Sequence, residues 1–201
     1  MNGQETGGRD MNGHEAGGKD PNGDDVEGHV APAPGANSRY PSANLVAAAL
    51  ADLGVPVARD GDDAFLVTLP GERRHRTLVW LLLGAHDLLI ESFVCRAPDE
   101  NRAEVYRYLL QRNARLRTVA YALDGVGDIH LVGRLARASV TAEEIDTVLG
   151  VVLAASDEDF NQILERGFAS AIRREWAWRT SRGQSVRNLE AFRHLIDDPR
   201  R

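Results

Sequence analysis

The sequence contains a single cysteine, Cys95. One cysteine excludes an intramolecular disulfide framework and is typical of proteins from a reducing compartment. The residue follows the apolar pair Phe93-Val94, whereas a reactive thiol needs a cationic and partly open setting. We therefore expect a half-buried, unreactive thiol.

Clusters of side chains that could perform chemistry are also missing. The six histidines lie far apart in the sequence, and the spacings His-x-x-x-His and Cys-x-x-Cys do not occur. The segment Gly125-Val126-Gly127 lacks the third glycine of a dinucleotide loop and enters a strand pattern, not a helix. No acid, base and nucleophile set can be assembled. The sequence thus predicts a protein that is not an enzyme, with no catalytic, cofactor-binding or metal-binding residues.

Long hydrophobic runs are absent as well. The longest charge-free apolar run, residues 77–85, is too short to cross a bilayer. The first residues are acidic and glycine-rich and lack the basic start and apolar centre of a signal peptide. We therefore expect a cytoplasmic protein with no membrane partner.

The first 38 residues differ in composition from the rest. A ten-residue repeat occupies residues 1–10 and 11–20, and a decayed copy follows. Nine of the nineteen glycines fall in residues 1–38, with almost no large apolar side chain, so we expect a disordered leader. Seven acidic and two basic side chains give this leader −5 of the total charge of −6. Residues 39–201 then carry −1, which argues against a dominant nucleic-acid surface.

Short apolar runs bounded by turn residues predict the strands. Residues 64–69, 77–83 and 88–95 form three such runs, with separators short enough for antiparallel hairpins. Residues 81–83 are all leucine, so that strand is expected to be central and covered by helix. Residues 119–123 and 129–133 predict a second hairpin.

Helix start signals separate and follow these strands. They occur at Ser42, ahead of an apolar stripe of Leu45, Ala48, Ala49 and Leu53; at Pro98-Asp99; at Thr141, which forms a capping box with Glu144; and at Ser156. Residues 188–196 could form one last short helix. The order α-βββ-α-ββ-α-α predicts an α+β fold with an antiparallel sheet of about five strands and helices packed on it.

The C-terminal segment is rich in arginine and tryptophan. Trp176 continues the apolar stripe of Phe168 and Ile172, while Trp178 lies off that stripe. Trp178 either packs beneath the last helix or belongs to a partner-binding surface, since tryptophan and arginine are enriched at binding hot spots. The residues predicted to bind a partner are Trp178, Arg179, Arg182 and Phe192.

Several motifs in this order resemble the YbjN-domain family of bacterial sensory-transduction regulators, and in particular its actinobacterial branch. They are residues 105–113, residues 122–124 with 127–134, residues 160–164, residues 175–179 and residues 188–192. The resemblance covers residues 42–196 and excludes the leader. It divides the chain into the leader 1–38, a YbjN-like domain 39–183 and a helical, arginine-rich tail 184–201.

The resemblance implies a fold like that of type III secretion chaperones, which is often dimeric and has no enzymatic activity attached to it. In such chaperones the middle helix and the following strand contribute to the dimer. Carried over to this sequence, the dimer interface would contain Tyr106, Tyr108, Leu109, Arg112, Val119 and Tyr121.

The first functional hypothesis is a cytoplasmic, non-enzymatic protein-binding module of chaperone, adaptor or regulatory type. It would be a homodimer, use no cofactor and bind a protein client through an apolar sheet or groove. One alternative is a regulator that acts on nucleic acid through the Arg/Trp tail. Another is a small-molecule sensor with a pocket between helix and sheet.

Overall fold

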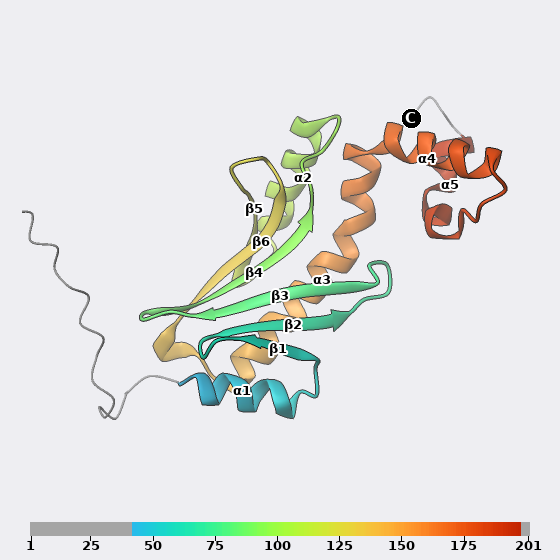
Figure 1. The fold of residues 1–201 in the computed structure, drawn as a ribbon. Coiled ribbons are helices and arrows are strands. Elements are labelled where there is room, and N and C mark those ends of the chain that lie inside the picture. Colours follow the sequence, from blue (N-terminus) through green and yellow to red (C-terminus); the bar gives the residue numbers. More distant parts are fainter. Residues whose placement is uncertain (1–41, 198–201) are drawn as a thin grey trace, which may run out of the picture. The chain divides into compact units, whose positions relative to one another are not determined.

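The computed structural model describes residues 42–197 and contains one six-stranded sheet with five α-helices (Figure 1). The helices are α1 (Ala43–Asp52), α2 (Arg102–Asn113), α3 (Ala142–Gly167), α4 (Ala169–Ser181) and α5 (Arg193–Asp197). The strands are β1 (Val57–Asp60), β2 (Ala64–Pro70), β3 (Arg76–Leu83), β4 (Asp87–Cys95), β5 (Val119–Leu123) and β6 (Ile129–Ala136). Neighbouring strands follow the order β1-β2-β3-β4-β6-β5 and are all antiparallel, which confirms the predicted α+β class.

Five of the strands lie where the sequence predicts them, and β1 is additional. All four residues of β1 are exposed, and the sequence Val57-Ala58-Arg59-Asp60 has no apolar alternation. The strand exists because it pairs with β2 along its whole length, at one edge of the sheet. Pairing of this kind leaves no local sequence signal.

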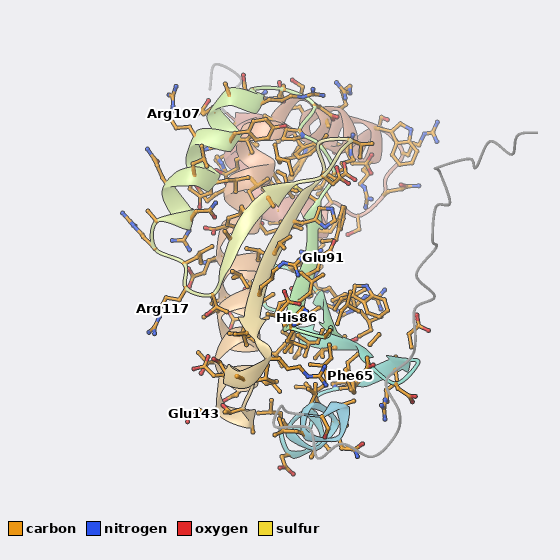
Figure 2. The ribbon with its side chains drawn as sticks, turned by 90° about the vertical axis from the view of Figure 1, so that its left-hand side faces the viewer. Phe65, His86, Glu91, Arg107, Arg117 and Glu143 are labelled. Carbon is orange, nitrogen blue, oxygen red and sulfur yellow. The ribbon has the colours of Figure 1, made fainter. Side chains whose placement is uncertain are left out.

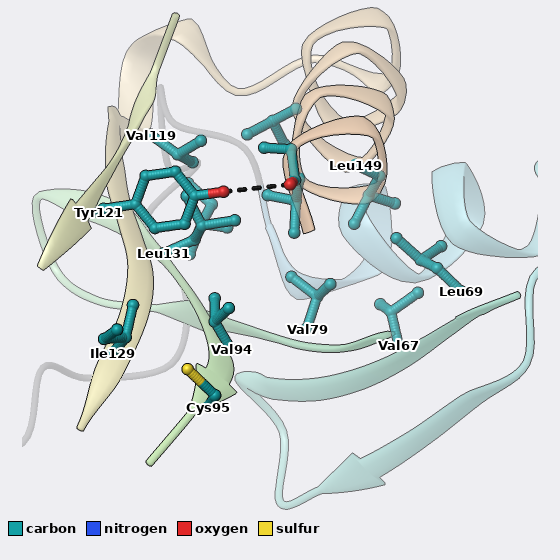
Figure 3. Packing of buried hydrophobic residues seen from close by; sticks show 14 of the residues in the cluster. Val67, Leu69, Val79, Val94, Cys95, Val119, Tyr121, Ile129, Leu131 and Leu149 are labelled. Atoms are coloured by element: carbon teal, nitrogen blue, oxygen red, sulfur yellow. Dashed lines mark hydrogen bonds between the residues drawn. The ribbon is translucent and has the colours of Figure 1, made fainter. Parts of the chain in front are cut away.

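The hydrophobic core lies between one face of the sheet and α3 (Figure 3). Alternate side chains of the strands point to this face, and the apolar stripe of α3 packs on them. The fully buried aliphatic residues of the sheet include Val67, Val79, Ile90 and Leu131, and those of α3 include Ile145, Val152 and Ile163. Burying each of these side chains contributes about 1.5–3 kcal/mol.

The helix start at Thr141 is confirmed, because the N–H of Glu144 donates to the hydroxyl of Thr141 at 3.1 Å, which is the N-cap half of the predicted capping box. The second start signal, at Ser156, is wrong. The helix α3 runs through it without interruption, and Ser156 is fully buried. The break comes at Phe168, whose φ of −142° ends α3, and α4 begins at the next residue.

The helix expected from Pro98-Asp99 begins later, at Arg102. The N–H groups of Asp99 and Glu100 donate to the carbonyl oxygen of Gly167, at 3.0 and 3.1 Å, so this segment ties the end of α3 instead of opening α2. The carboxylate of Glu100 accepts the N–H of Ser170, 2.6 Å away, in the first turn of α4.

The stripe predicted for α1 is displaced by one residue. The buried side chains of α1 are Val46, Ala49 and Leu50, whereas Ala48 is exposed and Leu53 is 36% exposed. Small alanines on every side of the helix weaken the contrast between its faces, so packing against the sheet and α3 decides its rotation.

The C-terminal part folds back on α4. A short 3₁₀ helix, Arg187–Phe192, leads into α5, in agreement with the helix predicted over residues 188–196. Phe192 and Leu195 are buried there, and the guanidinium of Arg173 donates to the carbonyl oxygen of Leu195 at 3.0 Å. The predicted leader, residues 1–38, and the last four residues of the tail lie outside the described residues.

Candidate protein-binding surface

The helices of residues 42–197 cover one face of the sheet and leave the other uncovered. In Figure 1 α3 passes behind the strands, and none of the helices of residues 42–197 lies in front of them. Strand residues that alternate with the core therefore point to an uncovered face, which we call the open face. Its central side chains are Leu66, Leu78, Trp80, Leu82, Leu89, Glu91, Phe93, His130 and Val132.

The open face is apolar, although the outer side of an antiparallel sheet is commonly polar. Strand pairing places Leu66, Trp80, Glu91 and Val132 in one row across four strands, and Leu82 opposite Leu89 in the next row. The all-leucine strand is central and covered by α3, as predicted, but the helices of residues 42–197 cover only one of its two apolar faces. Leu82 is only half-buried, while Leu81 beside it is fully buried on the α3 side.

Two of the apolar side chains of the open face are widely exposed. Phe93 is 46% exposed and Leu78 is 37% exposed. Contiguous apolar surface of this kind is rare on monomeric proteins and is typical of interaction sites.

One carboxylate, that of Glu91, lies in the centre of this apolar surface. Its side chain is 40% exposed, and its Oε1 lies 3.2 Å from Nδ1 of His130 without a hydrogen bond between them. The imidazole of His130 meets the ring of Phe93 edge-on, with 5.4 Å between the ring centres. Figure 2 shows Glu91 on the side of the sheet away from α3.

A buried carboxylate on the other side of the sheet fixes α2 and β5 against α3. Asp159 of α3 is 2% exposed and accepts hydrogen bonds from the hydroxyl of Tyr108 (2.6 Å), from Nε of Arg112 (2.8 Å) and from the hydroxyl of Tyr121 (2.8 Å). Burial raises the pKa of both tyrosines, and the Asp159 carboxylate raises it further. We call these four residues the Asp159 cluster.

The same helix α2 closes the outer edge of β5. The side-chain amide of Asn113 accepts the N–H of Tyr121 at 2.7 Å and donates to its carbonyl oxygen at 3.2 Å. The amide thus takes the place of a neighbouring strand at this position, which protects the edge from pairing with another chain.

The residues predicted for a dimer interface lie around this contact. Leu109, Val119 and Tyr121 are buried, and Tyr108 and Arg112 are half-buried in the Asp159 cluster. Tyr106 is half-buried and lines a hollow of 290 Å³ between α2 and β5, together with the exposed residues Leu110 and Leu123. The dimer role of these residues stays a prediction.

The predicted partner-binding residues of the C-terminal segment have different environments. Trp178 is 43% exposed, and the guanidinium carbon of Arg182 lies 4.6 Å from the centre of one of its rings. Arg179 binds the carboxylate of Glu175 at 2.6 Å, and Phe192 is 5% exposed. A partner could therefore touch Trp178 and Arg182, whereas Phe192 packs inside the chain. Their binding role stays a prediction.

The structure also places the lone thiol and the acidic side chains. Cys95 is buried, and its burial raises the pKa of the thiol to about 11, which agrees with the expected inert environment. Within the part of the chain that is described, no three His, Cys, Asp or Glu side chains are grouped to hold a metal ion. None of the described helices is long and apolar enough to cross a membrane.

Sequence reasoning missed the roles of Asp157 and Asp159. Both follow the helix start expected at Ser156, yet they lie in the middle of α3. The carboxylate of Asp157 accepts the N–H groups of Arg73 and Arg74, at 2.8 Å each, and so holds the loop between β2 and β3. The sequence does contain an indication of these roles, because acidic residues interrupt the apolar stripe of a long helical pattern.

Comparison with known proteins identifies the family. A family model described as "YbjN: Putative bacterial sensory transduction regulator" matches residues 42–165. This chain belongs to the YbjN family. The matched residues contain the entire sheet and most of α3, so the open face lies inside the family domain, and α4 and α5 lie beyond it.

Relatives of this chain occur in mycobacteria. An uncharacterized protein of Mycobacterium leprae is 58% identical over 145 residues, which cover 72% of this chain and 77% of that protein. A second one, from Mycobacterium tuberculosis, is 58% identical over 132 residues, 66% of this chain and 72% of its own length. These relatives agree with the resemblance to the actinobacterial branch.

Among solved structures, YbjN of E. coli is similar at 18% identity and a TM-score of 0.43, covering 65% of this chain and 92% of that one. The type III secretion chaperone SycH of Yersinia pestis, solved with a fragment of a second protein, is similar at 14% identity and a TM-score of 0.41. That similarity covers 57% of this chain and 95% of the chaperone chain.

Proposed function

We propose that this YbjN-family chain is a non-enzymatic, cytoplasmic protein-binding module of chaperone or adaptor type, which holds a segment of a client protein on its open face. The observation that carries the proposal is that β3 and β4 are apolar on both sides while α3 covers only one side. An apolar partner segment gains free energy by removing the open face from water.

In this proposal the two faces of the sheet have different roles. The Asp159 cluster and the packing of α3 stabilise the sheet on one face. The open face, on the opposite side, remains accessible to a client. A homodimer through α2 and β5, with Tyr106 and Leu110 at its surface, is compatible with this arrangement, because these elements do not cover the open face.

The proposal is tested by changing exposed apolar residues on and off the open face. Leu78→Asp and Phe93→Asp each place a charge on the open face, at positions exposed enough for the chain to stay folded. We expect each to weaken client binding by at least about thirtyfold, as for an interface hot spot. Client binding is measured by capture from a lysate of the native host on the immobilised full chain, with competition by soluble chain.

The matched control is Val126→Asp. Val126 is 77% exposed and apolar, but it lies in the turn between β5 and β6 and not on the open face. This variant should capture the same client as the unchanged chain. Capture that survives both open-face changes, or that is lost equally in the control, would show that the client binds elsewhere.

A further inference from the structure

We infer that the segment held on the open face presents an arginine side chain to Glu91, surrounded by apolar side chains. This inference rests on the proposed function and specifies which clients the surface accepts. Glu91 is the middle residue of β4, and its partners in the row across the sheet are Trp80 and Val132. An apolar client that covers this row must also cover the carboxylate.

Covering Glu91 without a cation is unfavourable. The side chain is 40% exposed, so water solvates the carboxylate in the free chain. Removing that water without providing a partner leaves a buried, unpaired charge, which is strongly unfavourable for binding.

The chain itself supplies little compensation. Within residues 42–197 the only basic side chain in contact with Glu91 is His130, and neither ring nitrogen of His130 makes a hydrogen bond. Arg134 lies diagonal to Glu91, in the next row of the open face, but its guanidinium is bound to Asp87 at 2.8 Å. A client arginine would give Glu91 a permanent cationic partner, which neither His130 nor the already paired Arg134 provides.

Two occupants from this chain fit the surface poorly. A second copy packed symmetrically, open face to open face, would bring two Glu91 carboxylates into one apolar interface, and like charges repel there. The leader, residues 1–38, carries seven acidic and two basic side chains and almost no large apolar ones. A separate client with apolar and cationic side chains complements the surface better.

The neighbour of Glu91 across the strand pair favours arginine over lysine. Trp80 lies directly opposite Glu91 in the register of β3 and β4, which places the two side chains next to each other on the open face. A planar guanidinium can bind the carboxylate and stack on the indole at the same time, whereas an ammonium is a compact, strongly hydrated charge.

The experiment selects peptides from a random-sequence display library on the full chain, and in parallel on Glu91→Gln and on Leu78→Asp. The unchanged chain should enrich apolar peptides with a central arginine, and Leu78→Asp should enrich neither these nor other apolar peptides. Replacing that arginine by glutamine in a selected peptide should weaken binding to the unchanged chain about tenfold, and binding to Glu91→Gln by much less.

Each other outcome would refute the inference, and the outcomes differ in whether they also refute the open-face function. Enrichment of apolar peptides without arginine, lost in Leu78→Asp, would leave the open face as a binding site but refute the role of Glu91. Failure to enrich any peptide, or enrichment that Leu78→Asp does not change, would refute the inference and the open-face function together. A concentration-dependent dimer that Leu78→Asp dissociates would identify a second copy as the occupant and refute the inference as well.

Discussion

Replacing Asp159 by alanine should lower the free energy of unfolding by about 3–5 kcal/mol, because a buried ion pair loses one partner. The carboxylate accepts hydrogen bonds from Tyr108, Arg112 and Tyr121, which come from two different elements. Its removal leaves the Tyr108 hydroxyl without its acceptor, and an unsatisfied buried polar group costs about 1–3 kcal/mol. Tyr121 keeps the carbonyl oxygen of Ala155, and Arg112 keeps only the exposed carboxylate of Glu158. Urea denaturation followed by circular dichroism measures the change.

The neighbouring residue provides the control for this prediction. Glu158 also contacts Arg112, at 3.2 Å, but its side chain is 61% exposed. Glu158→Ala should therefore change stability by less than about 1 kcal/mol, as expected for an exposed ion pair. Equal effects of the two substitutions would mean that the cluster does not hold α2 and β5 in place.

The Asp159 cluster should also make the free energy of unfolding fall at alkaline pH. Burial and the nearby carboxylate raise the pKa of Tyr108 and Tyr121 in the folded chain above the ordinary value of about 10. Above about pH 10 the tyrosines lose their protons more readily in the unfolded chain than in the folded chain. Their contribution to the free energy of unfolding is therefore constant below that pH and falls as the pH rises above it. Buried Cys95, with a pKa raised to about 11, contributes in the same direction.

Substitution of Gly133 by alanine should lower the free energy of unfolding by about 2–3 kcal/mol, within the range for overpacked sites. Gly133 lies in β6 opposite Val119 of β5. A Cβ atom there would come within 2.5 Å of the carbonyl oxygen of Thr118 and 2.7 Å of Cγ1 of Val119. Thr118 has a φ of 69°, so its backbone has little freedom to move away.

Gly150 is the matched control for this second prediction. It lies on the exposed side of α3, and a Cβ atom there would meet nothing within 4 Å. Gly150→Ala should raise the free energy of unfolding by about 0.5–1 kcal/mol, because alanine loses less backbone entropy in a helix. If Gly133→Ala were as harmless as Gly150→Ala, the close packing of β5 on β6 would be disproved.

Local patterns in the sequence predict most of the elements but not how they are covered. The N-cap at Thr141 and the alternation in β5 are correct because each depends on neighbouring residues. The strand β1 has no such pattern and forms only through pairing with β2. The interpretation of Ser156 as a helix start failed because packing on both sides of that residue keeps α3 continuous.

The candidate site, too, could be predicted from local sequence patterns only in part. The sequence reveals that residues 81–83 are apolar on both faces, and we expected this strand to be central and covered by helix. Which face stays open depends on the path of α3, and that path is a property of the whole fold. The Asp159 cluster joins residues 38 to 51 positions apart in the chain, and no local spacing predicts such contacts.

The central claim is that clients bind to the open face, and site-specific photo-cross-linking in living cells tests it most directly. A photoreactive phenylalanine analogue is placed at position 78 or 93 on the open face, and at position 107 or 126 as controls. Arg107 points outward from α2, as Figure 2 shows, and Val126 lies in the β5–β6 turn. We expect positions 78 and 93 to cross-link to the same client protein and the control positions to give no such product. Cross-links to that client from position 107 or 126 alone, or to a second copy of the chain from positions 78 and 93, would contradict the claim.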